Sequence, residues 1–376
     1  MSTTIIVPVF NGGRFLPAFF RSLGGALPHD SQLIFVDDGS TEPVLENLPE
    51  FPNAADVVIL RNRENLGYSV AVNRGFGAAT GEFIVQLNTD LILDPACITS
   101  MLALLQAEQN AGIVGSKLLY PTTRRVQHIG MGVGHFTKKH IYHQLPVDHP
   151  LCRRTRPMQI MTGATVAMTR RVLDRIGPLD ERYFNAQEDL DHCMRAVDRG
   201  YVNYVCADSV AYHWVSQSGA SRFARVREAD AAFWATWHGR IRVDLGAFVD
   251  EAIDSVVTRY PHLAEYDFEL LNLCRSGDDA ILLDAVGRAW PRTANTGHHH
   301  RQVNNPDAAY WLPMLVPYWV QSNPRPFIYL VDHFQQLREN WLWFHERLEL
   351  VRDELIVDTT GCVVTASELL SMEAVG

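Results

Sequence analysis

Short runs of apolar residues alternate with segments of helical periodicity through the first two thirds of the chain. Five runs have the length and composition of buried β-strands, namely Thr4–Val9, Gln32–Val36, Asp56–Leu60, Glu82–Leu87 and Gly112–Val114. Between the first two runs, one helical face carries Phe15, Leu16, Phe19, Phe20 and Leu23. Another helix is expected after Gly67 and ends near Gly81. This order predicts an open, largely parallel α/β sheet with helices on both faces.

The same pattern continues in the middle of the chain and then changes near residue 222. The strand-like segment QIMTGATVAMT is followed by a helix that starts at Glu188 and has its apolar residues on one face. Beyond Ser221, helical periodicity and tryptophans replace the strand signals, as in EADAAFWATWHGRIR. We therefore predict a Rossmann-like α/β domain over residues 1–222 and a mainly α-helical domain over residues 223–376.

The composition is that of a globular protein with a large core. The chain has 376 residues, of which 47% are hydrophobic and 20% charged. Its net charge is −10, whereas a surface that binds nucleic acid is basic, so we expect no nucleic-acid partner. We find no signal-like N-terminus and no apolar run long enough to span a membrane, which predicts a cytoplasmic protein, at most peripheral at the inner face of the membrane. The six scattered cysteines are interpreted as reduced thiols.

Polar residues follow several of the predicted strands, at the edge where parallel sheets bind ligands. The first strand ends in VPVFNGG, the second ends in IFVDDGST, and the third leads into NRENLGYSVAVNRGFGAATGE. Glycines let the backbone approach a ligand, and a helix N-terminus favours negative charge. Asp37 and Asp38 are suited to binding ribose hydroxyls or the edge of a base. Each motif alone is equally typical of an ordinary turn between a strand and a helix.

The fourth strand ends in VQLNTDLILDP, where three polar residues interrupt an apolar sequence. Asn88 and Asp90 alternate along the strand end, so their side chains point to the same side. Two oxygen ligands in that arrangement suit a divalent cation that also holds phosphates. The alternative is a turn that leads into a helix, with Asp94 as its N-cap.

Two further motifs lie later in the chain. Glu188, Asp189 and Asp191 cluster at the start of a helix in RYFNAQEDLDHCMRA, where acids also simply complement the helix dipole. His213 follows a strand in SVAYHW, and a histidine among aromatic residues is often a core residue. The order and spacing of the six motifs carry more information than any one of them.

In that order the motifs resemble glycosyltransferase family 2, enzymes with the nucleotide-sugar-binding GT-A fold, and within it the bacterial rhamnosyltransferase-like branch. The resemblance covers roughly Thr3 to Ser221. It rests on VPVFN, VDDGST, NLGYSVAVNRG, LNTD, MTGATVAMTRR, GPLDERYFNAQEDLDHCMRA and AYHW. It implies an inverting hexosyl- or deoxyhexosyltransferase (EC 2.4) of polysaccharide biosynthesis, which moves a sugar from a nucleoside diphosphate to a hydroxyl acceptor.

The resemblance also implies roles for individual residues. Asp189 would be the general base that deprotonates the acceptor, and Glu188 would assist it. Asp90 and His213 would hold a divalent cation, Mn²⁺ or Mg²⁺, at the diphosphate. A nucleotide-sugar site is implied at Pro8, Phe10, Asn11, Asp38, Gly67, Asn73 and Asn88.

Two positions depart from the family pattern. The metal motif usually begins with Asp, whereas Asn88 keeps an oxygen ligand and removes a charge, which predicts weaker binding of the metal. Mixed oxygen and imidazole ligands suit Mn²⁺ better than Mg²⁺. Gly67 replaces the basic residue that some relatives place near the nucleotide. The sequence therefore does not determine the nucleotide base of the donor, and UDP and dTDP sugars are the expected donors.

Residues 223–376 lie outside the family pattern. The aromatic stretch YWLPMLVPYWVQSNPRPFIYLVDHF is interpreted as a buried helical core, because Arg325 is its only Lys or Arg residue and membrane-surface helices carry several. The segment GHHHRQ is interpreted as a polar loop. We expect this region to shape the site for the acceptor (a glycan, lipid-linked glycan or other glycoconjugate) or to mediate formation of a homo-oligomer.

Three other classes fit the sequence less well. A nucleotidyltransferase would carry a Gly-rich basic loop after the first strand, and VFNGGRF has one Arg and few glycines. A dinucleotide-dependent oxidoreductase would carry G-x-G-x-x-G in that place, which is absent. A catalytically inactive nucleotide-sugar-binding scaffold is the remaining alternative, and the presence of both Asp90 and Asp189 argues against it.

Overall fold

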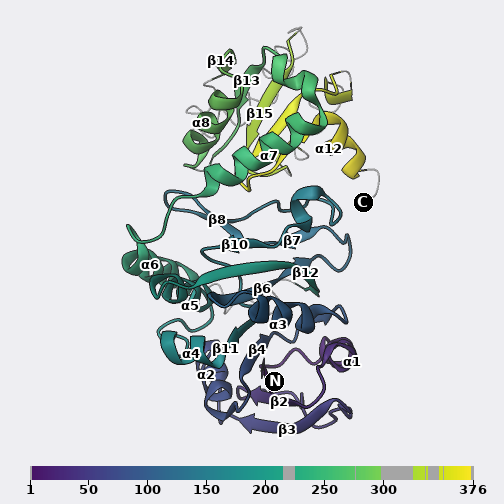
Figure 1. Cartoon of the computed structure of the whole chain (residues 1–376), viewed down its shortest axis with the longest axis vertical. Coiled ribbons are helices and arrows are strands. Elements are labelled where there is room, and N and C mark those ends of the chain that lie inside the picture. The colour runs from purple at the N-terminus through teal and green to yellow at the C-terminus, as the bar shows by residue number, and fades with distance from the viewer. Residues whose placement is uncertain are drawn as a thin grey trace. The chain divides into compact units, whose positions relative to one another are not determined.

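The computed structural model forms two compact units (Figure 1). It describes residues 2–214, 225–275, 277–297, 325–334, 336–337, 347–349 and 351–373. The first unit comprises Met1–Met131 and Val147–Ile241, and the second comprises Gly132–Pro146 and Arg242–Gly376. Residues 215–224, the histidines of GHHHRQ and most of the aromatic stretch lie outside the described residues.

A ten-stranded sheet forms the centre of the first unit, with the order β10-β12-β6-β11-β4-β1-β2-β3 and with β5 and β7 paired to β12 and β6. The strands are β1 (Thr3–Val9), β2 (Ser31–Asp37), β3 (Ala54–Arg61), β4 (Phe83–Leu87), β5 (Leu91–Leu93), β6 (Ala111–Leu119), β7 (Val126–His128), β10 (Arg156–Met158), β11 (Thr165–Thr169) and β12 (Val202–His213). β1, β2, β3, β4, β6 and β12 share one direction, and β11, β10, β5 and β7 run the opposite way. The predicted open α/β sheet is confirmed.

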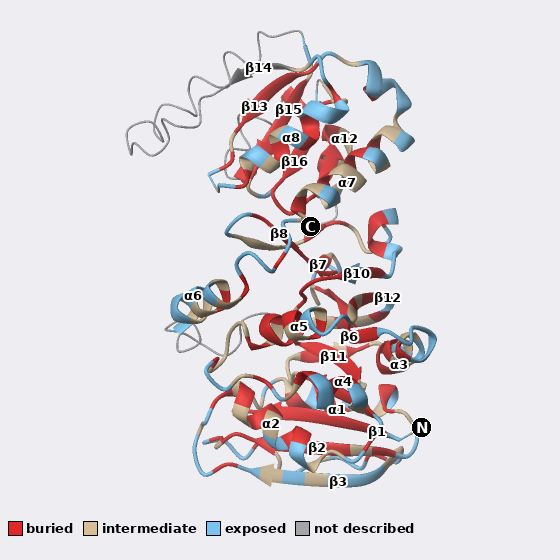
Figure 2. Cartoon of the chain, turned by 60° about the vertical axis from the view of Figure 1, so that its left-hand side comes forward, coloured by how far each residue is buried: buried red, intermediate tan, exposed pale blue. Residues whose placement is uncertain are grey.

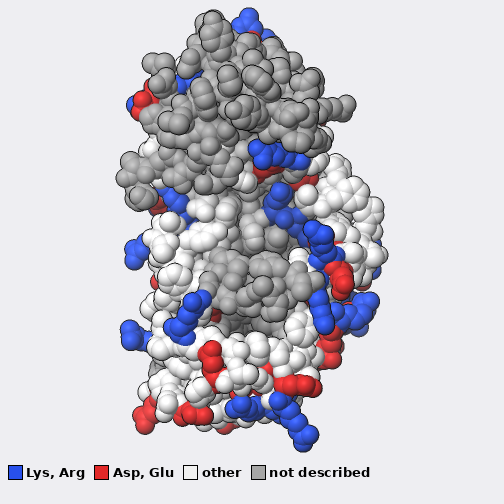
Figure 3. Space-filling model, turned by 180° about the vertical axis from the view of Figure 1, so that it is seen from behind, with Lys and Arg blue, Asp and Glu red and all other residues white. Residues whose placement is uncertain are grey.

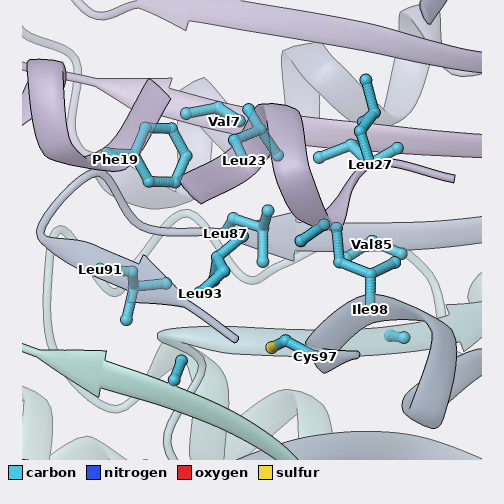
Figure 4. Close-up of a cluster of buried hydrophobic side chains, with 14 of the residues drawn as sticks. Val7, Phe19, Leu23, Leu27, Val85, Leu87, Leu91, Leu93, Cys97 and Ile98 are labelled. Carbon is cyan, nitrogen blue, oxygen red and sulfur yellow. The ribbon is translucent and has the colours of Figure 1, made fainter. Parts of the chain in front are cut away.

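One face of this sheet packs against α1 (Leu16–Ala26) and α3 (Cys97–Ala107). Figure 4 shows the apolar cluster between them, in which Leu23 of α1, Leu87 of β4 and Ile98 of α3 take part. The predicted apolar face of α1 points into this cluster. Each large side chain buried there contributes roughly 1.5–3 kcal/mol to stability.

The opposite face is covered by α2 (Tyr68–Ala78), α4 (Arg170–Ile176) and α5 (Glu188–Asp198), as Figure 1 shows. Side chains alternate along a strand, so the residues of β4 that do not enter the α1–α3 core point this way. Gln86 is one of them, and it is buried. Figure 2 shows the strands buried between the helices, whereas the edge strand β3 is partly exposed.

The second unit has its own five-stranded sheet, with the order β14-β13-β15-β16-β17. Its elements are β13 (Glu269–Asn272), β14 (Ala294–Gly297), β15 (Phe327–Val331), β16 (Leu355–Asp358), β17 (Val363–Thr365), α7 (Leu245–Arg259), α8 (Asp279–Ala289), α12 (Ala366–Glu373) and the 3₁₀ helix η3 (Pro261–Glu265). The pair β8 (Met131–Val133) and β9 (Lys138–His140) forms a separate hairpin. The expected helices are present, but the sheet that they accompany was not predicted.

The division between the units also differs from the predicted boundary at residue 222. Helix α6 (Val226–Trp237) belongs to the first unit, although it follows the change in composition. The indole Nε1 of Trp237 donates a hydrogen bond of 2.9 Å to Asp191 Oδ1 and so links α6 to α5. Along the chain, the composition therefore changes about one helix before the boundary between the two units.

All six cysteines are free and buried, in agreement with their interpretation as reduced thiols; Cys152 is among them. A further short helix, η1 (Pro150–Arg153), belongs to the first unit. No helix within the described part of the chain is long and apolar enough to cross a membrane. Figure 3 shows acidic and basic side chains interspersed on one face, as expected for a chain with a pI of about 5.8.

Candidate functional site

The loops that follow β1 and β2 are joined through Asn11. Its backbone N–H donates to Ser40 Oγ at 2.9 Å, and its Oδ1 accepts from the backbone N–H of Thr41 at 2.9 Å. Asn11 has a φ of 51°, a left-handed conformation that asparagine adopts more readily than most residues. Its neighbour Phe10 is 46% exposed, whereas Pro8 is buried in β1. The carboxyl end of β1 thus offers an exposed aromatic ring.

The carboxylate of Asp38 accepts hydrogen bonds from other residues of the chain. Asp38 is 3% exposed, and its carboxylate accepts from Asn62 Nδ2 at 2.6 Å and from the N–H groups of Leu66 and Gly67 at 3.0 and 2.9 Å. Gly67 has a φ of 100°, and a Cβ on it would lie 2.7 Å from the ring of Phe184. Glycine is therefore required here, and Asp38 fixes the loop at the start of α2.

The N-terminus of α2 is also tied to the segment that precedes α5. The N–H of Tyr68 donates to the carbonyl oxygen of Phe184 at 2.9 Å, and the hydroxyl of Ser69 donates to the carbonyl oxygen of Tyr183 at 2.7 Å. These bonds bring a helix from the first hundred residues against the acidic helix near residue 189.

A partly buried polar chain runs from Asn88 through Tyr68 to Gln86. The Tyr68 hydroxyl donates to Asn88 Oδ1 at 2.7 Å and accepts from Gln86 Nε2 at 2.9 Å. Gln86 Nε2 also donates to the carbonyl oxygen of Gly163 at 3.1 Å, which can only accept and so fixes the orientation of this amide. The Tyr68 hydroxyl consequently engages one of the two lone pairs of the Asn88 oxygen.

The chain reaches Asp189 at Gly163. The N–H of Gly163 donates to Asp189 Oδ2 at 2.8 Å, and a Cβ on Gly163 would lie 2.8 Å from Asp189 Cβ. The glycine of the MTGAT motif is therefore what lets the first turn of α5 approach the sheet. Gln86, Gly163, Glu188 and Asp189 line one small cavity on this face.

The electrostatics of Tyr68 show that the two acidic motifs share one environment. Burial raises the pKa of Tyr68 well above its usual value of 10.0, and the nearby carboxylates of Glu188, Asp189 and Asp90 raise this pKa further. Coulomb interactions act over short range in a folded protein, so the acids of both motifs lie near the same hydroxyl. The phenol stays neutral at physiological pH and keeps its hydrogen to donate.

Asp90 and His213 are brought together by the pairing of β5 with β12, in which His213 lies opposite Leu91. His213 Nε2 lies 3.4 Å from Asp90 Oδ1, and the two side chains are 11% and 17% exposed. The other ring nitrogen, Nδ1, lies 2.6 Å from Gln127 Oε1. The pairing of an acid and a histidine 123 positions apart was predicted, and the structure places them side by side.

Other predicted residues face elsewhere. Asn73 donates to the carbonyl oxygen of Leu179 at 2.9 Å and to Glu181 at 3.0 Å, so it links α2 to the segment before α5. Asp191 is 3% exposed and binds Arg195 at 2.9 Å in addition to Trp237. Of the three acids in QEDLD, Asp191 is thus structural, Glu188 is buried, and Asp189 is half-buried at the edge of the cavity.

Residues 4–177 match the family model described as glycosyl transferase family 2. The match runs from β1 to the end of α4 and includes Asp38, Gly67, Asn88 and Asp90. This segment belongs to glycosyltransferase family 2. Asp189 and His213 lie beyond the matched segment.

Named relatives agree with this family assignment. The chain is 25% identical over 261 residues to N-acetylglucosaminyl-diphospho-decaprenol L-rhamnosyltransferase of Mycobacterium tuberculosis, covering 62% of this chain and 84% of the relative. It is 33% identical over 119 residues to undecaprenyl-phosphate 4-deoxy-4-formamido-L-arabinose transferase of Enterobacter sp., covering 30% of this chain and 36% of the relative. The family 2 chain is a glycosyltransferase, and the expected resemblance to the rhamnosyltransferase branch is confirmed.

Among solved structures, the crystal structure of GalNAc-T7 with UDP, GalNAc and Mn²⁺ has a TM-score of 0.52 to this family 2 chain. The two are 11% identical, and the match covers 87% of this chain and 58% of the other. At that identity the likeness shows the fold alone, and it supports the predicted GT-A architecture.

The sequence did not single out three residues of this family 2 site. Gln86 was taken as part of an apolar strand, Tyr68 lies within NLGYSVAVNRG but was given no role, and Gln127 lies in no motif. The available signal was a polar residue inside a buried strand, since such a group requires a hydrogen-bond partner. The partners, at Gly163 and at His213, are separated from these residues by 77 and 86 positions, which no local pattern reveals.

Proposed function

We propose that this chain is an inverting glycosyltransferase that transfers a sugar from a UDP or dTDP sugar to a hydroxyl group of a glycoconjugate acceptor. The observation that carries the proposal is the hydrogen-bonded chain that joins Asn88 to Asp189 within the first unit. Displacement at an anomeric carbon requires one group at the leaving diphosphate and another at the attacking hydroxyl. The two ends of the chain supply groups suited to these tasks.

Asp189 is proposed as the general base. Its carboxylate accepts from the N–H groups of Gly163 and Leu190, both at 2.8 Å, and these bonds fix its orientation at the first turn of α5. As the acceptor oxygen attacks the anomeric carbon, Asp189 takes its proton, and the bond to the diphosphate oxygen breaks with its electron pair. Attack opposite the leaving group inverts the configuration. Glu188, at the first position of the same helix, is proposed to help orient the acceptor.

A divalent cation is proposed to bind at Asp90 and His213. Their ligand atoms are 3.4 Å apart, close to the separation of about 3 Å expected for adjacent ligands at about 2.1 Å from an octahedral ion. The described residues contain no group of three His, Cys, Asp or Glu that could hold a metal, so the remaining ligands would come from the diphosphate and water. When bound, Mn²⁺ or Mg²⁺ supplies Lewis-acid stabilisation of the departing phosphate.

The nucleotide is proposed to lie along the carboxyl ends of β1, β2 and β4. Phe10 offers an exposed ring, and the Asn88 NH₂ group is suited to donate to a phosphate oxygen. Gly67 is buried, and it is proposed to act by permitting the turn at the start of α2. Asp38 and Asn11 are proposed to act by holding the bordering loops. Asn73 and Pro8 are placed in this supporting group as well.

The acceptor is proposed to be a lipid-linked glycan that the enzyme reaches peripherally at the inner face of the membrane. Both named relatives carry a polyprenyl group in their substrate names, which supports an acceptor of that class. The second unit is proposed to shape the acceptor site or to mediate self-association.

A panel of UDP-, dTDP- and GDP-sugars tests the proposal on the full chain by thermal shift and by donor hydrolysis, each with and without Mn²⁺. We expect one donor to raise the melting temperature in the presence of Mn²⁺ and to be hydrolysed slowly, because a ligand that binds the folded state stabilises it. Binding of a donor without hydrolysis or transfer to any acceptor would favour the inactive scaffold. If no donor binds, both the active transferase and the inactive nucleotide-sugar-binding scaffold are excluded.

A further inference from the structure

Gln127 is a buried polar residue in the short strand β7, and both ends of its amide contact His213. It is 6% exposed. Its Nε2 donates to the backbone carbonyl oxygen of His213 at 3.0 Å, and its Oε1 lies 2.6 Å from ring Nδ1 of the same residue. One side chain thereby holds both the main chain and the imidazole of a residue at the end of β12.

These two contacts determine which ring nitrogen carries the hydrogen. A backbone carbonyl oxygen can only accept, so the nitrogen of the Gln127 amide must face it. The amide oxygen then faces Nδ1 and can also only accept. Nδ1 must therefore be the N–H donor, and in a neutral imidazole Nε2 then presents a lone pair.

That lone pair faces a second acceptor. Nε2 of His213 lies 3.4 Å from Oδ1 of Asp90, and with Nδ1 holding the hydrogen, neither atom has a hydrogen to donate to the other. Two acceptors held this close to each other favour a positive charge shared between them. The arrangement is the one found around metal-binding histidines, whose second N–H is held by an oxygen acceptor.

We propose that Gln127 is a positioning residue, which fixes the tautomer and ring orientation of His213 so that Nε2 and the Asp90 carboxylate bind the divalent cation together. This inference rests on the proposed function, because it concerns the cation of that reaction. Gln127 acts through His213 and contacts neither the cation nor the sugar. Removal of such an outer partner lowers metal affinity by roughly 10- to 100-fold.

The tautomer is tested directly by ¹⁵N NMR of the full chain labelled at histidine, without metal and at a pH where imidazole is neutral. The signals of His213 are assigned by their loss in His213→Gln. We expect wild-type His213 to be protonated at Nδ1. In Gln127→Leu, which removes both contacts, we expect the population to move toward the Nε2–H form. A wild-type ring protonated at Nε2 overturns the inference, whether or not the variant folds.

The second measurement is the dissociation constant of Mn²⁺ alone, obtained by electron paramagnetic resonance titration. We expect roughly 10- to 100-fold weaker binding in Gln127→Leu and partial recovery in Gln127→Glu, which keeps an acceptor for Nδ1–H. Equal affinities in wild type and Gln127→Leu would overturn the inference and leave the proposed transferase intact. If wild type binds no Mn²⁺ either alone or with UDP, dTDP or GDP added, both the inference and the cation of the proposed mechanism fail. The donor screen then tests the rest of the proposed function.

Discussion

Both units carry carboxylates where parallel strands end, but the exposure and the hydrogen-bond partners of these carboxylates differ. In the first unit, Asp90 follows β4 and is partly exposed beside His213. In the second unit, Asp358 at the end of β16 is 1% exposed, and its Oδ1 accepts from the N–H groups of Thr360 and Cys362 at 2.9 and 3.1 Å. An acid at a strand end is therefore a candidate for chemistry when it keeps an accessible acceptor, and a structural element when its own loop uses it.

The second unit also contains a buried ion pair. Arg347 and Glu354 are 2.7 Å apart, and their side chains are 6% and 0% exposed. The Tyr329 hydroxyl donates to the same carboxylate at 2.7 Å. Here the protein surrounds a buried charge with its own side chains, whereas Asp189 is half-buried and lines a small cavity.

The largest expected effect comes from Asp189→Asn, which keeps an oxygen for the Gly163 N–H and removes the base. We expect the turnover number to fall roughly 100- to 10,000-fold, because proton removal from the acceptor then has no carboxylate. Donor affinity, measured by calorimetry with the nucleotide sugar, should stay within about twofold, since the change is nearly isosteric.

The matched control is Asp198→Asn, at the other end of α5, where the acid pairs with Arg240 on the surface. Surface pairs contribute little, so this variant should retain both activity and stability. Full activity of Asp189→Asn would contradict the assigned base, and an equal loss in both variants would indicate damage to the helix instead.

Asp358→Asn tests whether the buried acid of the second unit has a structural role. Burial raises the pKa of Asp358 to about 7, so the folded state holds a proton that the unfolded chain releases near its usual value of 3.8. Wild type therefore loses stability as pH rises from about 4 through about 7, whereas the amide does not titrate. We expect the unfolding free energy of the variant relative to wild type to increase by roughly 2–4 kcal/mol between pH 4 and pH 8.

Denaturant unfolding at several pH values measures this difference, with the exposed acid Asp254→Asn of α7 as control. A difference that is flat with pH would show that Asp358 ionises in its folded surroundings as it does in the unfolded chain. A slope that also occurs in Asp254→Asn would assign the effect to general charge.

The sequence predicted the first unit well because its signals are local. Apolar runs and helical faces located β1, α1 and β4, and polar residues at a strand end and at a helix start located Asp90 and Asp189. The sheet of the second unit was missed because strands such as ELLN and LIVD are short apolar runs, which periodicity does not distinguish from turns of helix.

The hydrogen-bond partners of the residues that organise the site could not be predicted from local sequence either. Asp38 and Asn73 carry the right chemistry for a ligand, but their hydrogen bonds go to their own chain, at Gly67 and Leu179. Such a choice between ligand and scaffold depends on contacts made only after folding.

The smallest expected effect comes from Tyr68→Phe. This variant tests whether the hydrogen bonds between Asn88 and Gln86 affect binding of the donor. The change deletes one hydroxyl that joins Asn88 to Gln86, and each lost hydrogen bond costs about 1 kcal/mol of stability. Without its partner the Asn88 amide is free to rotate, so we expect donor affinity to fall about 2- to 10-fold by calorimetry. Tyr204→Phe, on the partly exposed part of β12, should change neither quantity. If Tyr68→Phe lowers stability but leaves donor affinity unchanged, Asn88 does not contact the donor, and the partly buried polar chain supports the fold of the first unit without setting the geometry at the diphosphate.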